Sequence, residues 1–86
     1  MRFQGAVVRE QGVTFAIAVV KRHVVDCQTT ARQAIGEFAG VFPGLPIVLM
    51  AQGPRGRPTY FGRPDIARFL SRIPLRSIPW REYTLN

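Results

Sequence analysis

The sequence has few of the residues that catalytic and metal sites need. Its 86 residues include one cysteine, one histidine and five acidic residues. A single cysteine excludes a disulfide within the chain, which fits a reducing compartment. One cysteine and one histidine fall short of the roughly four ligands of a zinc site, the acids form no close pair, and no Walker or Rossmann phosphate-binding loop is present. We therefore expect no metal, no cofactor and no enzyme acting alone.

Long hydrophobic runs are also lacking. The longest apolar run covers residues 13–20, is interrupted by Thr14 and has the length of a strand. A helix that crosses a bilayer needs about 20 apolar residues, so no membrane span is expected. Residues 1–12 carry charges and glycine where a signal peptide has its apolar stretch, which predicts a cytoplasmic protein. Apolar residues make up 47% of the chain, enough for the core of one small domain over residues 1–86.

Acidic residues are scarcest where basic residues gather. The formal net charge is +7, and residues 53–81 hold seven arginines against one acid, Asp65. A basic half of this kind favours an anionic partner such as nucleic acid, an acidic protein or a membrane surface. The alternative is a GC-rich coding bias, which would also explain the abundance of Ala, Gly and Pro and would make the charge incidental.

The hydrophobic pattern predicts four strands and two helices. Alternating or continuous short apolar runs indicate strands, and an i, i+3, i+4, i+7 spacing indicates amphipathic helices. In chain order we expect strands over 2–9 and 13–21, a helix over 30–39, strands over 47–51 and 59–62, and a helix over 64–73. Thr30 and Gln33 have the spacing of a capping box at the start of the first helix, and Asp26 is an alternative cap that would start this helix earlier and include Cys27. Gly12 suits a tight turn between the first two strands. The tail, with Trp80 and Tyr83, is expected to fold back on the body as a short edge strand.

These elements predict a two-layer α+β fold of order β-β-α-β-β-α. A β-α-β crossover makes the second and third strands parallel, and each hairpin partner then lies outside them. The expected sheet is mixed and four-stranded, in the order 1-2-3-4, with two helices packed on one face. Both faces of the strand over 13–21 are apolar, so this strand should be central and covered by helix on at least one side.

The second expected helix turns its arginines toward water. Its apolar stripe consists of Ile66, Phe69, Leu70 and Ile73. Arg68 and Arg72 lie on another face, one turn apart, where they suit neighbouring phosphates. The candidate nucleic-acid-binding residues are Arg55, Arg57, Arg63, Arg68, Arg72 and Arg76, with Tyr60, Phe61 and Trp80 as stacking surfaces. The alternative is that any surface helix needs a polar face and that the aromatic residues belong to the core.

The stretch PRGRP, residues 54–58, resembles the centre of an AT-hook, an arm that lies in the minor groove of A·T-rich DNA. The resemblance implies that Arg55 and Arg57 point into the groove and that the prolines stiffen the arm. Its flanks lack the further basic residues of such arms, and the stretch joins two expected strands. The favoured interpretation is a hairpin loop with solvated arginines.

The single cysteine closes the stretch RHVVDC, residues 22–27. A thiol at a helix start has its pKa lowered by the local field, so Cys27 is a candidate reactive thiol. A strand leading to such a cysteine, followed by GLPIVLMA at 44–51, resembles thioredoxin-fold proteins. The resemblance implies a facing Pro46 in the cis form, although the second cysteine of C-x-x-C is missing. The alternative is a small buried hydrophobic residue.

Three functions remain, in order of preference. The first is a non-catalytic binding module whose arginine-rich surface meets an anionic partner, with nucleic acid ahead of an acidic protein. The second is a protein-interaction or homo-oligomerising domain, such as a homodimer, whose sheet edges pair with another chain and whose charge is incidental. The third is a thioredoxin-like thiol protein without C-x-x-C.

Overall fold

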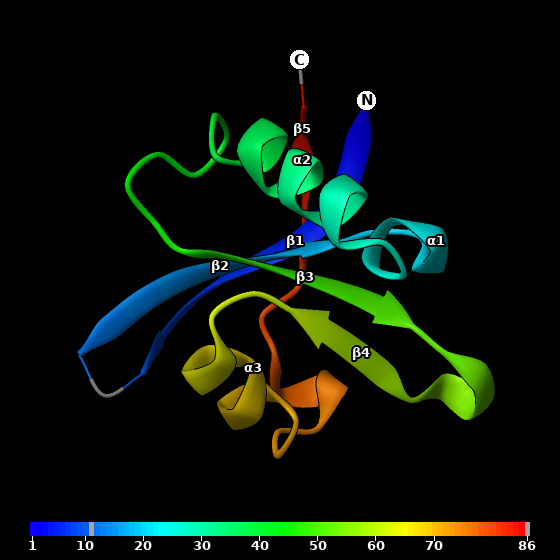
Figure 1. Ribbon diagram of the computed structural model, residues 1–86. Coiled ribbons are helices and arrows are strands. Elements are labelled where there is room, and N and C mark those ends of the chain that lie inside the picture. Colours follow the sequence, from blue (N-terminus) through cyan, green and yellow to red (C-terminus); the bar gives the residue numbers. More distant parts are fainter. Residues whose placement is uncertain (11, 86) are drawn as a thin grey trace.

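The computed structural model describes residues 1–10 and 12–85 as one mixed sheet between two layers of helix (Figure 1). The elements are β1 (Arg2–Glu10), β2 (Val13–Val19), α1 (Arg22–Val25), α2 (Gln28–Phe38), β3 (Ile47–Gln52), the 3-10 turn η1 (Pro54–Gly56), β4 (Pro58–Phe61), α3 (Pro64–Leu70), the 3-10 turn η2 (Leu75–Ser77) and β5 (Arg81–Thr84). Gly12 takes a left-handed φ of +79° in the predicted tight turn, whose other residue, Gln11, lies outside the described residues. No helix in the described ranges is long and apolar enough to cross a membrane.

The strands lie in the order β4-β3-β2-β1-β5. β2 and β3 are parallel, with Val19 opposite Met50, and the other neighbouring pairs are antiparallel. The predicted order 1-2-3-4 is therefore confirmed for the first four strands. The predicted total of four strands is wrong, because the tail adds β5 on the outer side of β1.

Aromatic packing explains why the tail joins the sheet. β5 pairs with β1, with Arg81 opposite Gly5. Tyr83 stacks on Phe3 and meets the ring of Phe42 edge-on, with ring centroids 5.6 and 4.9 Å apart. These contacts remove aromatic surface from water that a loose tail would leave exposed. The edge strand expected in the tail is confirmed.

Helices cover both faces of the sheet, so the predicted packing of both helices on one face is wrong (Figure 1). On the side of α1 and α2 the buried cluster contains Phe3, Ala16, Ala18, Ala31, Phe38, Phe42, Ile47 and Leu49. On the side of α3 and η2 it contains Ala6, Phe15, Ile17, Val48, Met50, Ile66, Leu70 and Ile78. Alternate residues of β2 and β3 belong to opposite clusters, and one layer of helix can cover only one of these apolar faces. The fold therefore has three layers rather than two.

The first long helix begins earlier than predicted. α2 starts at Gln28 with Cys27 as its N-cap residue, so neither the start at residue 30 nor the alternative cap, Asp26, which ends α1, is correct. The hydroxyl of Thr30 does not cap α2; its single hydrogen is shared between the carbonyl oxygens of Val24 and Cys27, at 2.8 and 2.9 Å. The contact with Val24 ties the end of α1 to the first turn of α2.

The last helix is shorter than predicted. α3 ends at Leu70, so Arg72 and Ile73 lie in the turn that follows it. The whole apolar stripe nevertheless packs in the cluster under the sheet: Ile66, Phe69, Leu70 and Ile73. The prediction that the stripe points inward is confirmed.

Candidate nucleic-acid interface

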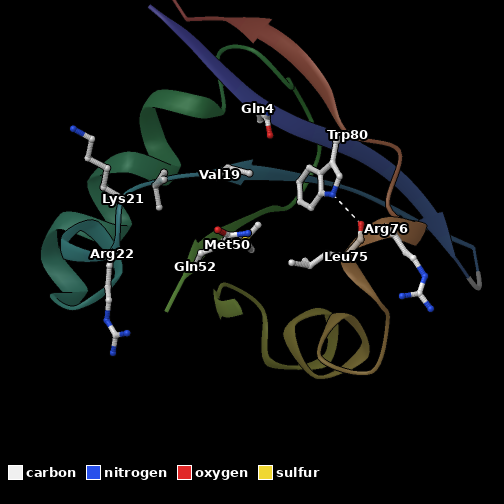
Figure 2. Close-up of a pocket in the computed structure, with 10 residues that line it drawn as sticks. Gln4, Val19, Lys21, Arg22, Met50, Gln52, Leu75, Arg76 and Trp80 are labelled. Atoms are coloured by element: carbon white, nitrogen blue, oxygen red, sulfur yellow. Dashed lines mark hydrogen bonds between the residues drawn. The ribbon is translucent and has the colours of Figure 1, made fainter. Parts of the chain in front are cut away.

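A cleft of about 660 Å³ opens at the carboxyl ends of the two parallel strands, on the α3 side of the sheet (Figure 2). Its floor includes Val19 and Met50, which are paired across β2 and β3. Carboxyl ends of parallel strands are a common place for ligand sites in open α/β sheets, since side chains from successive strands converge there. The location therefore makes this cleft the first candidate for a binding site.

Trp80 forms one wall of the cleft (Figure 2). Its indole Nε1–H donates a hydrogen bond of 2.9 Å to the carbonyl oxygen of Leu75, which fixes the ring at the entrance to β5. The ring is half-buried and packs against the cluster that contains Ile78. The indole is thus held rigidly while part of its surface stays open to the cleft.

Two cations form the rim opposite Trp80. Lys21 and Arg22 follow β2 directly, are exposed and extend outward from the cleft in Figure 2. Arg22 also reaches the start of the β3–β4 loop, because a Cβ atom built on Gly53 would lie only 2.8 Å from its Nη1. Its other neighbour is Asp26, at 3.8 Å between Nε and Oδ1, a long and exposed pair that leaves most of the guanidinium free to bind.

The PRGRP stretch forms the loop between β3 and β4. Arg55 and Gly56 take left-handed φ values of +61° and +72°, and Gly53 donates its N–H to the carbonyl oxygen of Arg57 at 2.7 Å. This closed loop differs from the extended arm of an AT-hook. Arg55 and Arg57 are exposed on this loop, whose first residue, Gly53, lies next to the guanidinium of Arg22.

The six predicted arginines come from three parts of the structure: the η1 loop, α3 with its flanks, and η2. Arg76 in η2 lines the cleft near Trp80, although its guanidinium points away from the ring (Figure 2). Arg68 lies on α3 and Arg72 just after it, and Figure 1 shows α3 and the η1 loop at opposite ends of the lower face. All six are exposed. Of the six, Arg76 lines the cleft, Arg55 and Arg57 lie on the η1 loop, and Arg63, Arg68 and Arg72 lie in or next to α3.

Arg63 is paired with an acid of its own chain. Its Nε and Nη2 donate to the two carboxylate oxygens of Asp65, at 3.1 and 2.7 Å. The hydrogen bonds raise the pKa of Arg63 and lower the pKa of Asp65. This bidentate pair cancels one positive charge beside α3. By contrast, Lys21, Arg55, Arg57 and Arg76 take part in no ion pair with another described residue.

Sequence reasoning missed Lys21, Arg22 and the two amides at the cleft, Gln4 and Gln52. A signal for the cations was present, because Lys21 and Arg22 stand directly after a strand that was expected to be central and parallel to its neighbour. The amides gave no such signal, because exposed glutamines at strand ends are common and their side of the sheet depends on the register.

Cys27 lies away from this cleft as the N-cap residue of α2, and its side chain is exposed. The backbone N–H groups of Thr30 and Thr29 lower the pKa of the thiol. The buried alternative is therefore wrong. The cis form of Pro46 is also wrong, because no peptide bond in the described ranges is cis. No group of three or more His, Cys, Asp or Glu side chains suited to a metal ion occurs among residues 1–10 and 12–85.

The chain matches no known family, no curated protein and no solved structure. The residues around the cleft therefore supply the argument for its function.

Proposed function

We propose that the protein is a non-catalytic binding module that holds a polyanion, in the first place nucleic acid, at the carboxyl ends of β2 and β3. One observation carries the proposal: three exposed cations from two separate segments line one cleft, and one of them extends to a loop that carries two more. Lys21, Arg22 and Arg76 line the cleft, and the loop that Arg22 reaches at Gly53 carries Arg55 and Arg57.

The charge balance at the cleft supports this assignment. Asp26 contacts Arg22 in a long, exposed pair of 3.8 Å, and the described residues that line the cleft include no carboxylate. Each phosphate that such side chains neutralise releases condensed counterions, which gives salt-dependent affinity without any buried ion pair. Fixed anchoring of the cations on strand ends and on a closed loop also lowers the ordering cost of binding.

The test compares two double charge reversals in a salt titration with a fluorescent random-sequence oligonucleotide. Lys21→Glu with Arg22→Glu alters the cleft, and Arg68→Glu with Arg72→Glu makes the same change in net charge on the α3 side. We expect the cleft variant to lose at least 10-fold in affinity at low salt, and its log–log salt slope to fall by roughly 1.4 for two lost single-strand contacts.

The α3 variant should lose much less affinity, because neither Arg68 nor Arg72 lines the cleft. Equal losses in both variants would show attraction by net charge alone and would remove the cleft from the proposal. Absence of binding by the native chain at low salt would reject a nucleic-acid role outright.

Self-association is the second candidate, because β4 and β5 each leave one edge without a neighbour in the described sheet. Unpaired strand edges are ready sites for pairing with a second copy. A mass that rises with protein concentration and persists at high salt would favour this function. A monomer mass at all concentrations would exclude it.

A further inference from the structure

We infer that the cleft is a subsite for one unstacked base of a single-stranded nucleic acid, with the base against Trp80 and the neighbouring phosphates at Lys21 and Arg22. The inference rests on the proposed function and narrows its ligand from polyanions in general to single strands. It is drawn from the distribution of aromatic, amide and cationic groups around the cleft.

Trp80 offers a ring face rather than a hydrogen-bond donor. Its one N–H is already used by the carbonyl oxygen of Leu75, at 2.9 Å. Figure 2 shows the ring at the side of the cleft that faces Val19, opposite Lys21 and Arg22. A rigid, partly exposed aromatic ring suits stacking with a base, and such stacking tolerates any sequence because every base has a π-face.

The floor and sides of the cleft match a nucleobase. Val19, Met50 and Leu75 supply apolar surface, while Gln4 and Gln52 stand on either side of Val19 in Figure 2. An amide side chain both donates and accepts hydrogen bonds, so these two can meet the polar edge of a base. The lining contains no carboxylate among the described residues, and its volume of about 660 Å³ is that of a small-molecule site.

The arrangement disfavours a duplex. Bases within a duplex are stacked on one another and paired, so a base can enter a cleft beside Trp80 only when it is splayed out. With a base in the cleft, its phosphates reach the rim where Lys21 and Arg22 extend into solvent (Figure 2). Sites for single strands combine an aromatic surface, on which a base stacks, with cations that bind the phosphates, and this cleft has both components.

Trp80 is the only tryptophan, so its emission reports directly on the cleft. The probes are a mixed-sequence DNA 12-mer, its duplex, an abasic strand of equal length, inorganic polyphosphate and a free mononucleotide. We expect the 12-mer to quench Trp80 and to bind at least 10-fold more tightly than the abasic strand or the duplex. Equal affinity for 12-mer and abasic strand without quenching would overturn the inference, as would a mononucleotide that binds as tightly as the 12-mer.

Variants test the wall and the amide separately, with binding followed by anisotropy of a labelled strand. Trp80→Leu should lower the affinity for the 12-mer about 10-fold and leave the affinity for the abasic strand unchanged. Trp80→Phe should keep most of the affinity for the 12-mer, because phenylalanine can still stack on a base. Because Trp80 also packs on the core, both variants are first checked by thermal unfolding. Gln52→Leu is an independent test at an exposed position and should also lower the affinity for the 12-mer. If the affinity for the 12-mer is unchanged in both Gln52→Leu and Trp80→Leu, the inference is overturned.

These outcomes separate the two proposals. If no probe binds, both fail. If every probe binds in proportion to its charge and Trp80 emission does not change, the polyanion site stands and the base subsite is rejected.

Discussion

Tyr83 stacks on Phe3 with ring centroids 5.6 Å apart and an angle of 23° between the planes, which joins the last strand to the first. The same two ends are linked by the backbone, because Leu85 donates its N–H to the carbonyl oxygen of Met1 at 2.7 Å. Figure 1 accordingly shows the start of β1 and the end of β5 on the same side of the molecule. Trp80 lies just before β5, so this docking also holds the aromatic wall of the cleft in place.

Tyr83→Ala is expected to lower the free energy of unfolding by about 2 kcal/mol, roughly half the cost of truncating a fully buried aromatic residue, because Tyr83 is half-buried. Chemical denaturation followed by circular dichroism measures the change. Glu82→Ala on the same strand is the control, since it removes only an exposed contact with Arg2 at 3.3 Å. Equal effects of the two substitutions would contradict the packing role of Tyr83.

Gly5→Ala is expected to destabilise the sheet by about 1–3 kcal/mol through overpacking. A Cβ atom at Gly5 would lie 2.6 Å from the backbone carbonyl oxygen of Ile17, which the ladder between β1 and β2 holds in place. Gly36→Ala is the matched control and should raise stability instead of lowering it. Nothing lies within 4 Å of a Cβ atom added at Gly36, and alanine in a helix interior is more stable than glycine by about 0.5–1 kcal/mol. Thermal unfolding of both variants measures the contrast.

Periodicity predicted most of the sheet, and the exceptions have a physical origin. The apolar runs located the first four strands, and the β-α-β crossover with its two hairpins predicted the parallel centre and the order of these strands. The apolar pattern of β2 and β3 shows that both faces need cover but does not say which helix covers which, because that depends on the path from β4 to α3. The Ile66 stripe was predicted to point inward, and it does so on the opposite face from α2.

The candidate site was harder to predict because it is assembled from separate segments. Arg76 and Trp80 come from the tail, while Lys21 and Arg22 follow β2, and only the sheet register brings them to one cleft. Composition pointed to the arginine-rich half, yet it gave no indication that Arg63 is held by Asp65. Charge density along a sequence therefore located the basic half of the chain but not the face that presents it.

Tyr60→Phe is expected to raise the free energy of unfolding by about 1 kcal/mol. The hydroxyl of Tyr60 is buried without a hydrogen-bond partner in the described structure, and an unsatisfied polar group carries a desolvation penalty of about 1–3 kcal/mol that phenylalanine avoids. Urea denaturation at neutral pH measures the difference. A loss of stability would show instead that the hydroxyl has a partner, such as water.

Alkaline pH should increase the difference in free energy of unfolding between the native chain and Tyr60→Phe. Burial raises the pKa of Tyr60 above its ordinary value of 10.0, so the folded state resists ionisation. A raised acid pKa means that stability is fully present below pH 10 and is lost as the pH rises from there toward the folded-state pKa. The native chain should lose stability in this window relative to Tyr60→Phe, and parallel profiles above pH 10 would contradict the shift.

Cys27 is expected to react with iodoacetamide faster in the folded chain than in urea at pH 7.5. Backbone N–H groups of Thr30 and Thr29 at the start of α2 lower its pKa below the ordinary value of 9.0, and its side chain is exposed. The thiolate is the reactive form, so the folded rate should titrate with a midpoint below 9.0 and the unfolded rate near it. The same lowered pKa makes the free energy of unfolding depend on pH. The folded state gains stability as the pH rises toward 9.0, and Cys27→Ser should show no such gain. A midpoint at or above 9.0, or faster reaction in urea, would show that the helix start does not stabilise the thiolate and would leave the cysteine without the reactivity that its position predicts.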